Sequence, residues 1–92
     1  MMTPMEAPDP QHRQLRENIA VMMQRVGIKG AHLAQAVGMT PATFSRRMHG
    51  QTTWLFHEFE LIASYFDLTL DELAYRLPSA DDWERRGGRN TP

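Results

Sequence analysis

The sequence predicts a single all-α domain, a compact five-helix bundle, on three observations. The chain has 92 residues, 41% of them hydrophobic, which is enough for one small core. Its apolar residues recur at spacings of three and four, as on one face of an α-helix, without the alternation typical of strands. Residues that cap or end helices separate these apolar stretches.

The first two helices are expected over residues 10–26 and 31–37. Asp9-Pro10 supplies a capping side chain and then a proline at the first helical position, a common helix start. The inner face of the first helix would consist of Leu15, Ile19, Met22, Met23 and Val26. Gly27 and Gly38 are expected to end the two helices, because glycine readily adopts the left-handed conformation found there.

Three further helices are expected after Gly38. Thr40-Pro41 is a second capped start, and the helix that follows carries Phe44 on its inner face and ends at Gly50. A fourth helix over residues 55–66 would turn inward Phe56, Phe59, Ile62, Ala63 and Phe66. Thr69 and Glu72 have the spacing of a capping box, which opens a fifth helix that extends to Leu77.

The predicted domain spans residues 10–78, between a flexible arm (residues 1–9) and a disordered tail (residues 79–92). The chain contains no cysteine, which excludes disulfides and thiolate metal sites. No apolar run approaches the roughly 20 residues that cross a bilayer, and the N-terminus does not resemble a signal peptide. These features favour a cytoplasmic protein.

The charges are segregated along the chain, although the formal net charge is only −1. No acidic residue occurs between Glu17 and Glu58. Within that interval the cations are Arg25, Lys29, Arg46 and Arg47, and the histidines are His32, His49 and His57. Such an interval predicts one positive face on a nearly neutral protein, suited to an anionic partner. The alternative is a basic patch without a ligand.

The stretch from Leu33 to Met48 has the composition of two short helices joined by a tight turn. Ala34 is small where two backbones would approach, and Gly38 can take the left-handed conformation that opens the turn. Met39 would fill the corner, Thr40 would cap the second helix, and Phe44 would anchor it. Leu33-Ala-x-x-Val-Gly-Met-Thr-Pro-x-Thr-Phe-Ser-Arg, followed by Gly50 and Ile62-Ala63, resembles the helix-turn-helix family of lambdoid phage repressors and Cro proteins.

The resemblance covers roughly residues 11–77 and implies a transcriptional regulator that places its third helix in the major groove of double-stranded DNA. The residues that match base-reading positions of the family are Ala42, Thr43 and Arg46. Arg46 is the first candidate, because a guanidinium can donate two hydrogen bonds to guanine. The residues that the resemblance places on the DNA backbone are Lys29, Gly30, Ala31, Thr40, Ser45, Arg47, His49, Thr53 and Trp54.

Several positions depart from the family or allow a second interpretation. Gly30 and Pro41 stand where many relatives carry glutamine. Arg47 stands where many carry an apolar core residue, so we expect its stem to pack along the surface and its head to reach a phosphate. Trp54 is interpreted as a core residue that covers the fourth predicted helix, as an indole N–H donor to a DNA phosphate, or as both. A segment with Trp83, Arg85, Arg86 and Arg89 is either a disordered tail or an arm along the DNA.

Other functions receive less support from the sequence. An antitoxin or adaptor that binds a protein through the same bundle is the alternative, suggested by Leu70, Tyr75 and Leu77 near the end of the predicted domain. Monomer and weak homodimer both remain compatible with the sequence. The histidines lack metal-ligand spacing, and no nucleophile has a base and an orienting acid nearby. We therefore expect no metal, cofactor, small-molecule effector or enzymatic activity.

Overall fold

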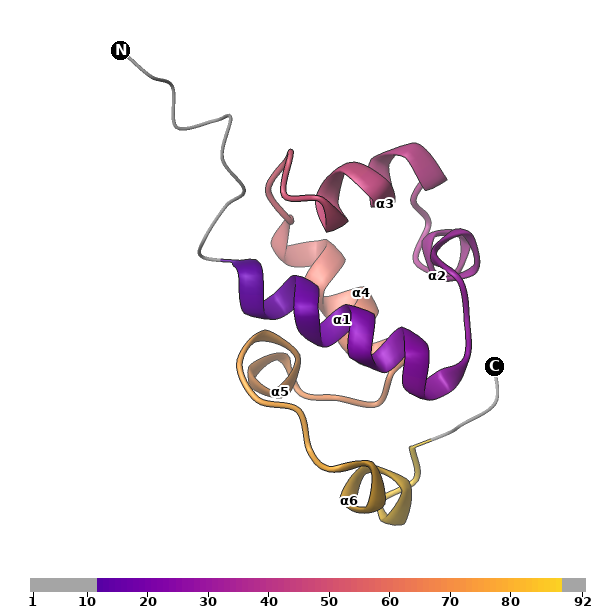
Figure 1. Ribbon diagram of the computed structural model, residues 1–92, viewed down its shortest axis with the longest axis vertical. Helices are drawn as coiled ribbons and strands as arrows, with labels where there is room; N and C mark the ends of the chain where they lie inside the picture. The colour runs from indigo at the N-terminus through magenta and orange to yellow at the C-terminus, as the bar shows by residue number, and fades with distance from the viewer. Residues whose placement is uncertain (1–11, 89–92) are drawn as a thin grey trace.

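The computed structural model describes residues 12–88, which form six α-helices (Figure 1). The helices are α1 (Arg13–Val26), α2 (Gly30–Ala36), α3 (Pro41–Met48), α4 (Phe56–Tyr65), α5 (Leu70–Ala74) and α6 (Ala80–Arg85). No strand occurs in this range, so the all-α prediction is confirmed. The predicted helix start at Asp9-Pro10 and the predicted arm over residues 1–9 lie outside the described residues.

The helix starts predicted from hydroxyl side chains are confirmed. Thr40 Oγ1 accepts a hydrogen bond of 3.1 Å from the Thr43 N–H, and a proline opens α3. Thr69 and Glu72 form both bonds of the capping box at the start of α5, at 3.1 and 2.9 Å. The predicted end of this helix is wrong, because α5 ends at Ala74. The residues that follow leave the helix, which lets Leu77 pack against the core.

The core lies where the inner faces of the helices meet. Its fully buried side chains include Leu15, Ile19, Met22, Leu33, Ile62, Phe66 and Leu73. The inner face predicted for the first helix is confirmed, with Met23 only partly buried. The inward prediction for Phe56 is wrong, since its side chain is 62% exposed at the first position of α4. Phe56 is on the outer side of the first turn of α4, whereas Glu58 in the same turn is buried.

A buried polar contact fastens α1 to α5. Asn18 is almost fully buried and donates from Nδ2 to the Leu73 carbonyl oxygen across 2.9 Å. Its own amide oxygen accepts from Gln14 Nε2 at 3.0 Å. Because buried amides are costly unless paired, these bonds fix the register of the two helices. In Figure 1, α1 crosses the middle of the molecule, with α2 and α3 toward one end and α6 at the other.

The prediction of a disordered tail is wrong for residues 79–88, which form α6 and its cap. Ser79 caps this helix, and Trp83, only 1% exposed, donates from Nε1 to the Phe66 carbonyl oxygen at 2.7 Å. Gly88 lies against the indole ring so closely that a Cβ there would be 2.3 Å away. A helix of six residues is too short to show a periodic pattern in the sequence, which is why it was not predicted. Its buried residue, Trp83, attaches it to the core. Residues 89–92 lie outside the described residues.

Two arginines strengthen the attachment of α6. The Arg25 guanidinium lies 5.7 Å from the centre of the Trp83 ring and donates to the Pro78 carbonyl oxygen. Arg86 donates to Glu72 at 2.7 Å, and this hydrogen bond lowers the pKa of Glu72 to about 2. These contacts turn Arg25, Trp83 and Arg86 toward the bundle. The alternative prediction of a nucleic-acid-binding arm at Trp83, Arg85, Arg86 and Arg89 is therefore wrong for Trp83 and Arg86.

Candidate nucleic-acid interface

The α2–turn–α3 unit is a fixed pair of helices. Leu33, Ala34 and Phe44 are buried between them and the rest of the core, and Met39 packs into the corner. The Met39 N–H donates to the Ala34 carbonyl oxygen at 2.8 Å, and Gly38 takes the predicted left-handed conformation with φ 78°. The backbone and core contacts together hold α3 in one orientation.

Gly30 has a role in this unit that the sequence did not reveal. It begins α2, and a Cβ at this position would lie 3.2 Å from the Phe44 ring and 3.8 Å from the end of Met23. The first turn of α2 therefore approaches the anchor of α3 so closely that a larger residue would require the Phe44 ring to move by a few tenths of an ångström. Glycine replaces the glutamine of many relatives here, and close packing is the physical reason that the structure offers.

One side of α3 is open to solvent. Its exposed residues are Pro41, Ala42, Ser45, Arg46 and His49, with Thr43 half-buried beside them. Arg46 Nη2 donates to Thr43 Oγ1 over 3.4 Å, a long bond that an exposed guanidinium can readily exchange for another acceptor. His49 Nδ1 lies 2.8 Å from the Ser45 carbonyl oxygen, within α3 and its cap. Five of these six residues were predicted to meet DNA.

Lys29, Ala31 and Thr53 are also exposed. Lys29 occupies the N-cap position of α2 in an extended conformation, and no side chain caps that helix. Thr53 belongs to the loop between α3 and α4. The structure thus leaves these predicted backbone-contact residues accessible, at the start of α2 and in the loop that follows α3.

Arg47 differs from its predicted position. Its Nε and Nη2 donate to the two carboxylate oxygens of Glu58 at 2.8 and 3.0 Å, and its Nη1 donates to Thr52 Oγ1 at 2.7 Å. The prediction that its head reaches outward to a phosphate is wrong for this structure, because the guanidinium is bound between α3 and α4. Glu58, the partner, was missed by the sequence analysis because the two residues are eleven positions apart on different helices.

Electrostatics favours the charged form of both partners. Burial raises the pKa of Glu58, but the hydrogen bonds from Arg47 and the Leu55 N–H, with the positive charge of Arg47, lower it below its usual value overall. The hydrogen bond to Glu58 raises the pKa of Arg47. The first acid after the acid-free interval is therefore neutralised by a cation from that interval.

Trp54 is a core residue, as one of its two interpretations predicted. It is 3% exposed and meets the Phe44 ring edge to face, with centroids 6.1 Å apart. Its indole nitrogen is buried and has no hydrogen-bond partner among the described residues. The other interpretation, an indole donor to phosphate, is wrong here because the nitrogen has no access to the surface.

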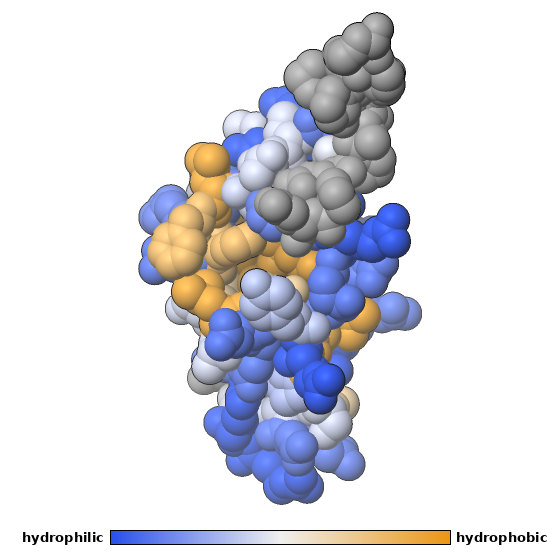
Figure 2. Space-filling model, turned by 90° about the vertical axis from the view of Figure 1, so that its left-hand side faces the viewer, coloured by the Kyte–Doolittle hydropathy of each residue, from blue (hydrophilic) through white to orange (hydrophobic). Residues whose placement is uncertain are grey.

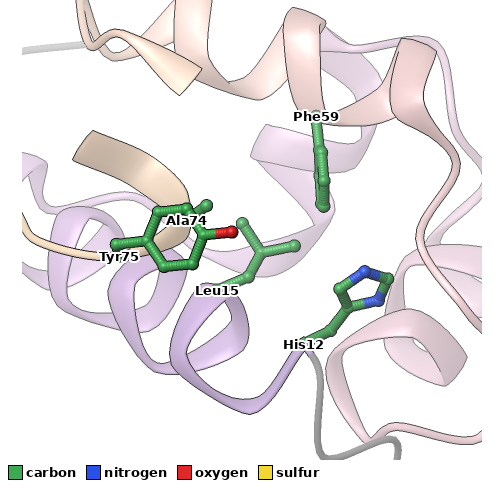
Figure 3. A pocket seen from close by; sticks show the side chains of 5 residues that line it. All are labelled: His12, Leu15, Phe59, Ala74 and Tyr75. Carbon is green, nitrogen blue, oxygen red and sulfur yellow. The ribbon is translucent and has the colours of Figure 1, made fainter. Parts of the chain in front are cut away.

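A separate surface, which we call the apolar flank, consists of Leu55, Phe56, Phe59 and Tyr75. Phe56 and Tyr75 are 62% and 74% exposed, and Figure 2 shows apolar side chains gathered on this side of the molecule. A pocket of about 360 Å³ opens here, lined by His12, Leu15, Phe59, Ala74 and Tyr75 (Figure 3). The rings of His12 and Phe59 meet edge to face across 5.3 Å. Leu70 and Leu77, which the sequence also suggested for a protein contact, are partly buried.

Residues 12–88 contain no cluster of three or more His, Asp or Glu side chains placed to hold a metal ion. The same residues include no helix with the length and apolar character needed to cross a membrane.

Comparison with known proteins identifies the helical unit. The family model of the Cro/C1-type helix-turn-helix DNA-binding domain matches residues 18–79, from the middle of α1 to the cap of α6. No curated protein and no solved structure matches the chain significantly. The matched segment covers most of the chain and contains the complete α2–turn–α3 unit described above. This chain belongs to the Cro/C1-type helix-turn-helix DNA-binding family.

Proposed function

We propose that this protein is a sequence-specific transcriptional regulator, a phage-type repressor or Cro-like protein that acts in the cytoplasm on double-stranded DNA. The observation that carries the proposal is the open side of α3, which is held by α2 and belongs to the stretch of sequence without acids between Glu17 and Glu58. Glu58, which ends the acid-free interval, is neutralised by Arg47. A positive, fixed and exposed helix is what major-groove recognition requires.

Within this proposal one group of residues contacts the base edges and a second group contacts the phosphates. Arg46 donates to guanine O6 and N7, while Ala42 and the methyl group of Thr43 contact a thymine methyl. Lys29, the amides of Gly30 and Ala31, Ser45, His49 and Thr53 meet phosphates and supply most of the affinity. Thr40 contributes mainly as the cap of α3.

Selection of bound duplexes from a random pool tests this function directly. We expect one recurring motif that contains a guanine. Titration of that duplex at two salt concentrations should show affinity falling steeply with salt, by a factor set by the number of phosphate contacts. A chain that binds no duplex at low salt, or that selects no motif, would contradict the proposal.

The apolar flank suits a second copy of this chain, in a weak homodimer. The flank begins at Leu55, two residues after Thr53, so it continues directly from the loop beside α3. Two copies joined there by a twofold axis along the molecule's long direction carry both α3 helices at the same end (Figure 1). Such an arrangement would present both α3 helices to one duplex, as palindromic half-sites about one helical turn apart require. An unlike protein bound to the flank is the antitoxin or adaptor alternative.

Substituting Phe56→Ser tests the homodimer. Phe56 is exposed, so we expect little change in stability, but the concentration at which sedimentation velocity detects dimers should rise at least about tenfold, as for removal of one good contact. Val21→Ser, at an exposed apolar site of α1 outside the flank, is the matched control and should leave dimerisation unchanged. A parent chain that is monomeric at all concentrations and selects an asymmetric single site would rule out the homodimer, whereas a chain that binds no duplex at low salt would favour the adaptor alternative.

A further inference from the structure

The end of α3 and the start of α4 are joined by one buried ion pair. Side-chain exposure is 15% for Arg47 and 11% for Glu58. The guanidinium holds the carboxylate through two parallel hydrogen bonds and reaches Thr52 with a third. Glu58 Oε1 also accepts from the Leu55 N–H at 2.9 Å, so it closes the loop from the α4 side. Together the two side chains link α3, the middle of the loop at Thr52, the end of the loop at Leu55, and α4.

We propose that Arg47 and Glu58 are positioning residues of the DNA interface and that Arg47 acts through Glu58 rather than on a phosphate. This inference rests on the proposed function. The pair fixes the direction of α3 relative to α4, and it fixes the loop that carries Thr53. A bidentate arginine–carboxylate pair is suited to this role, because its planar geometry restrains both distance and angle.

The pair also removes an unfavourable charge from the interface. An unpaired carboxylate at Glu58 would lie next to the loop beside α3 and would repel phosphates. Arg47 cancels that charge at a distance of 2.8 Å, so the pair adds almost nothing to the net field. Arg47 is thus occupied by Glu58, while Arg46, its neighbour in sequence, is exposed to solvent.

The variant Glu58→Gln distinguishes a positioning role from an effect of charge, because the two change the affinity for DNA in opposite directions. It makes the protein more positive by one unit, so an effect of charge alone would strengthen DNA binding. Loss of the bidentate pair loosens α3, so we expect affinity for the selected duplex to fall at least about fivefold, the lower end of one base contact. Affinity for random duplexes should fall less. Tighter or unchanged binding of the selected duplex by folded Glu58→Gln would overturn the proposal.

The variant Arg47→Met tests whether Arg47 touches a phosphate. We expect weaker binding of the selected duplex, and we expect the slope of log K against log salt to match that of the parent once Glu58→Met is added, because no carboxylate is then left unpaired; loss of a phosphate contact lowers the slope by about 0.9 in the double variant as well. Lys29→Met, at an exposed cation, is the matched control for the same change of charge. A slope still reduced by about 0.9 in Arg47→Met/Glu58→Met would overturn the proposal.

The double variant Arg47→Met/Glu58→Met removes both charges and keeps the site filled, which protects folding. Because the two residues act as one unit, we expect its loss of affinity to be smaller than the sum of the losses in the two single variants, and additive losses would contradict this. Each measurement uses the full chain at a temperature where circular dichroism shows the variant folded. If the parent itself bound no duplex, the proposed function would fail instead of the positioning role.

Discussion

Replacing Trp83 with alanine is expected to lower the free energy of unfolding by about 3–5 kcal/mol, the range for removing a buried aromatic ring. Trp83 is the anchor of α6, almost fully buried and bonded to the Phe66 carbonyl oxygen. The substitution leaves a cavity, an unpaired buried acceptor and no surface for Gly88. Since small domains are stable by about 5–15 kcal/mol, this loss is a large fraction of the total. Urea denaturation followed by circular dichroism measures it.

Conservative substitutions separate the hydrogen bond from the packing. Trp83→Phe should lose the indole donor at a cost of about 1–3 kcal/mol for the buried acceptor left behind. Trp54→Phe is the matched control, because the buried indole nitrogen of Trp54 has no partner to lose. We therefore expect Trp83→Phe to be the more destabilising of the two. An unfolding free energy of Trp83→Ala within about 0.5 kcal/mol of the parent would show that α6 is not part of the core.

Replacing Arg46 with alanine is expected to weaken binding of the selected duplex by about 1–3 kcal/mol and to relax the preference at one base pair. The side chain is exposed, and its bond to Thr43 is long, so the fold loses little. Competition titrations with duplexes altered one base pair at a time locate the affected position. The unfolding free energy, measured in parallel, should stay within about 0.5 kcal/mol of the parent.

Arg46→Lys is the control for charge. Lysine keeps the positive charge but cannot present two donors in the plane of a guanine edge. We expect this variant to retain the affinity for random duplexes and to lose much of the discrimination. If the ratio of the affinities for the selected and the altered duplexes were the same in Arg46→Ala as in the parent, Arg46 would not recognise a base.

The helix-turn-helix unit was predictable from sequence because local chemistry determines it. Thr40 caps α3 through its own hydroxyl, and Gly38 supplies the left-handed turn. The apolar spacing within α3 placed Phe44 on the inner face, where the structure buries it. Each of these features depends on residues within about one helical turn, so spacing alone reveals it. The same holds for the capping box at Thr69.

Contacts between residues far apart in sequence were decided by the tertiary structure alone. Arg47 and Glu58 stand on different helices, and a cation in an acid-free stretch gives no sign that it is already paired. Nothing near Trp83 in sequence indicates that its indole N–H donates to the Phe66 carbonyl oxygen. Phe56 follows the same spacing as its buried neighbours, yet its side chain is exposed. Periodicity determines which side chains share a face, whereas burial and pairing depend on what the rest of the chain places opposite that face.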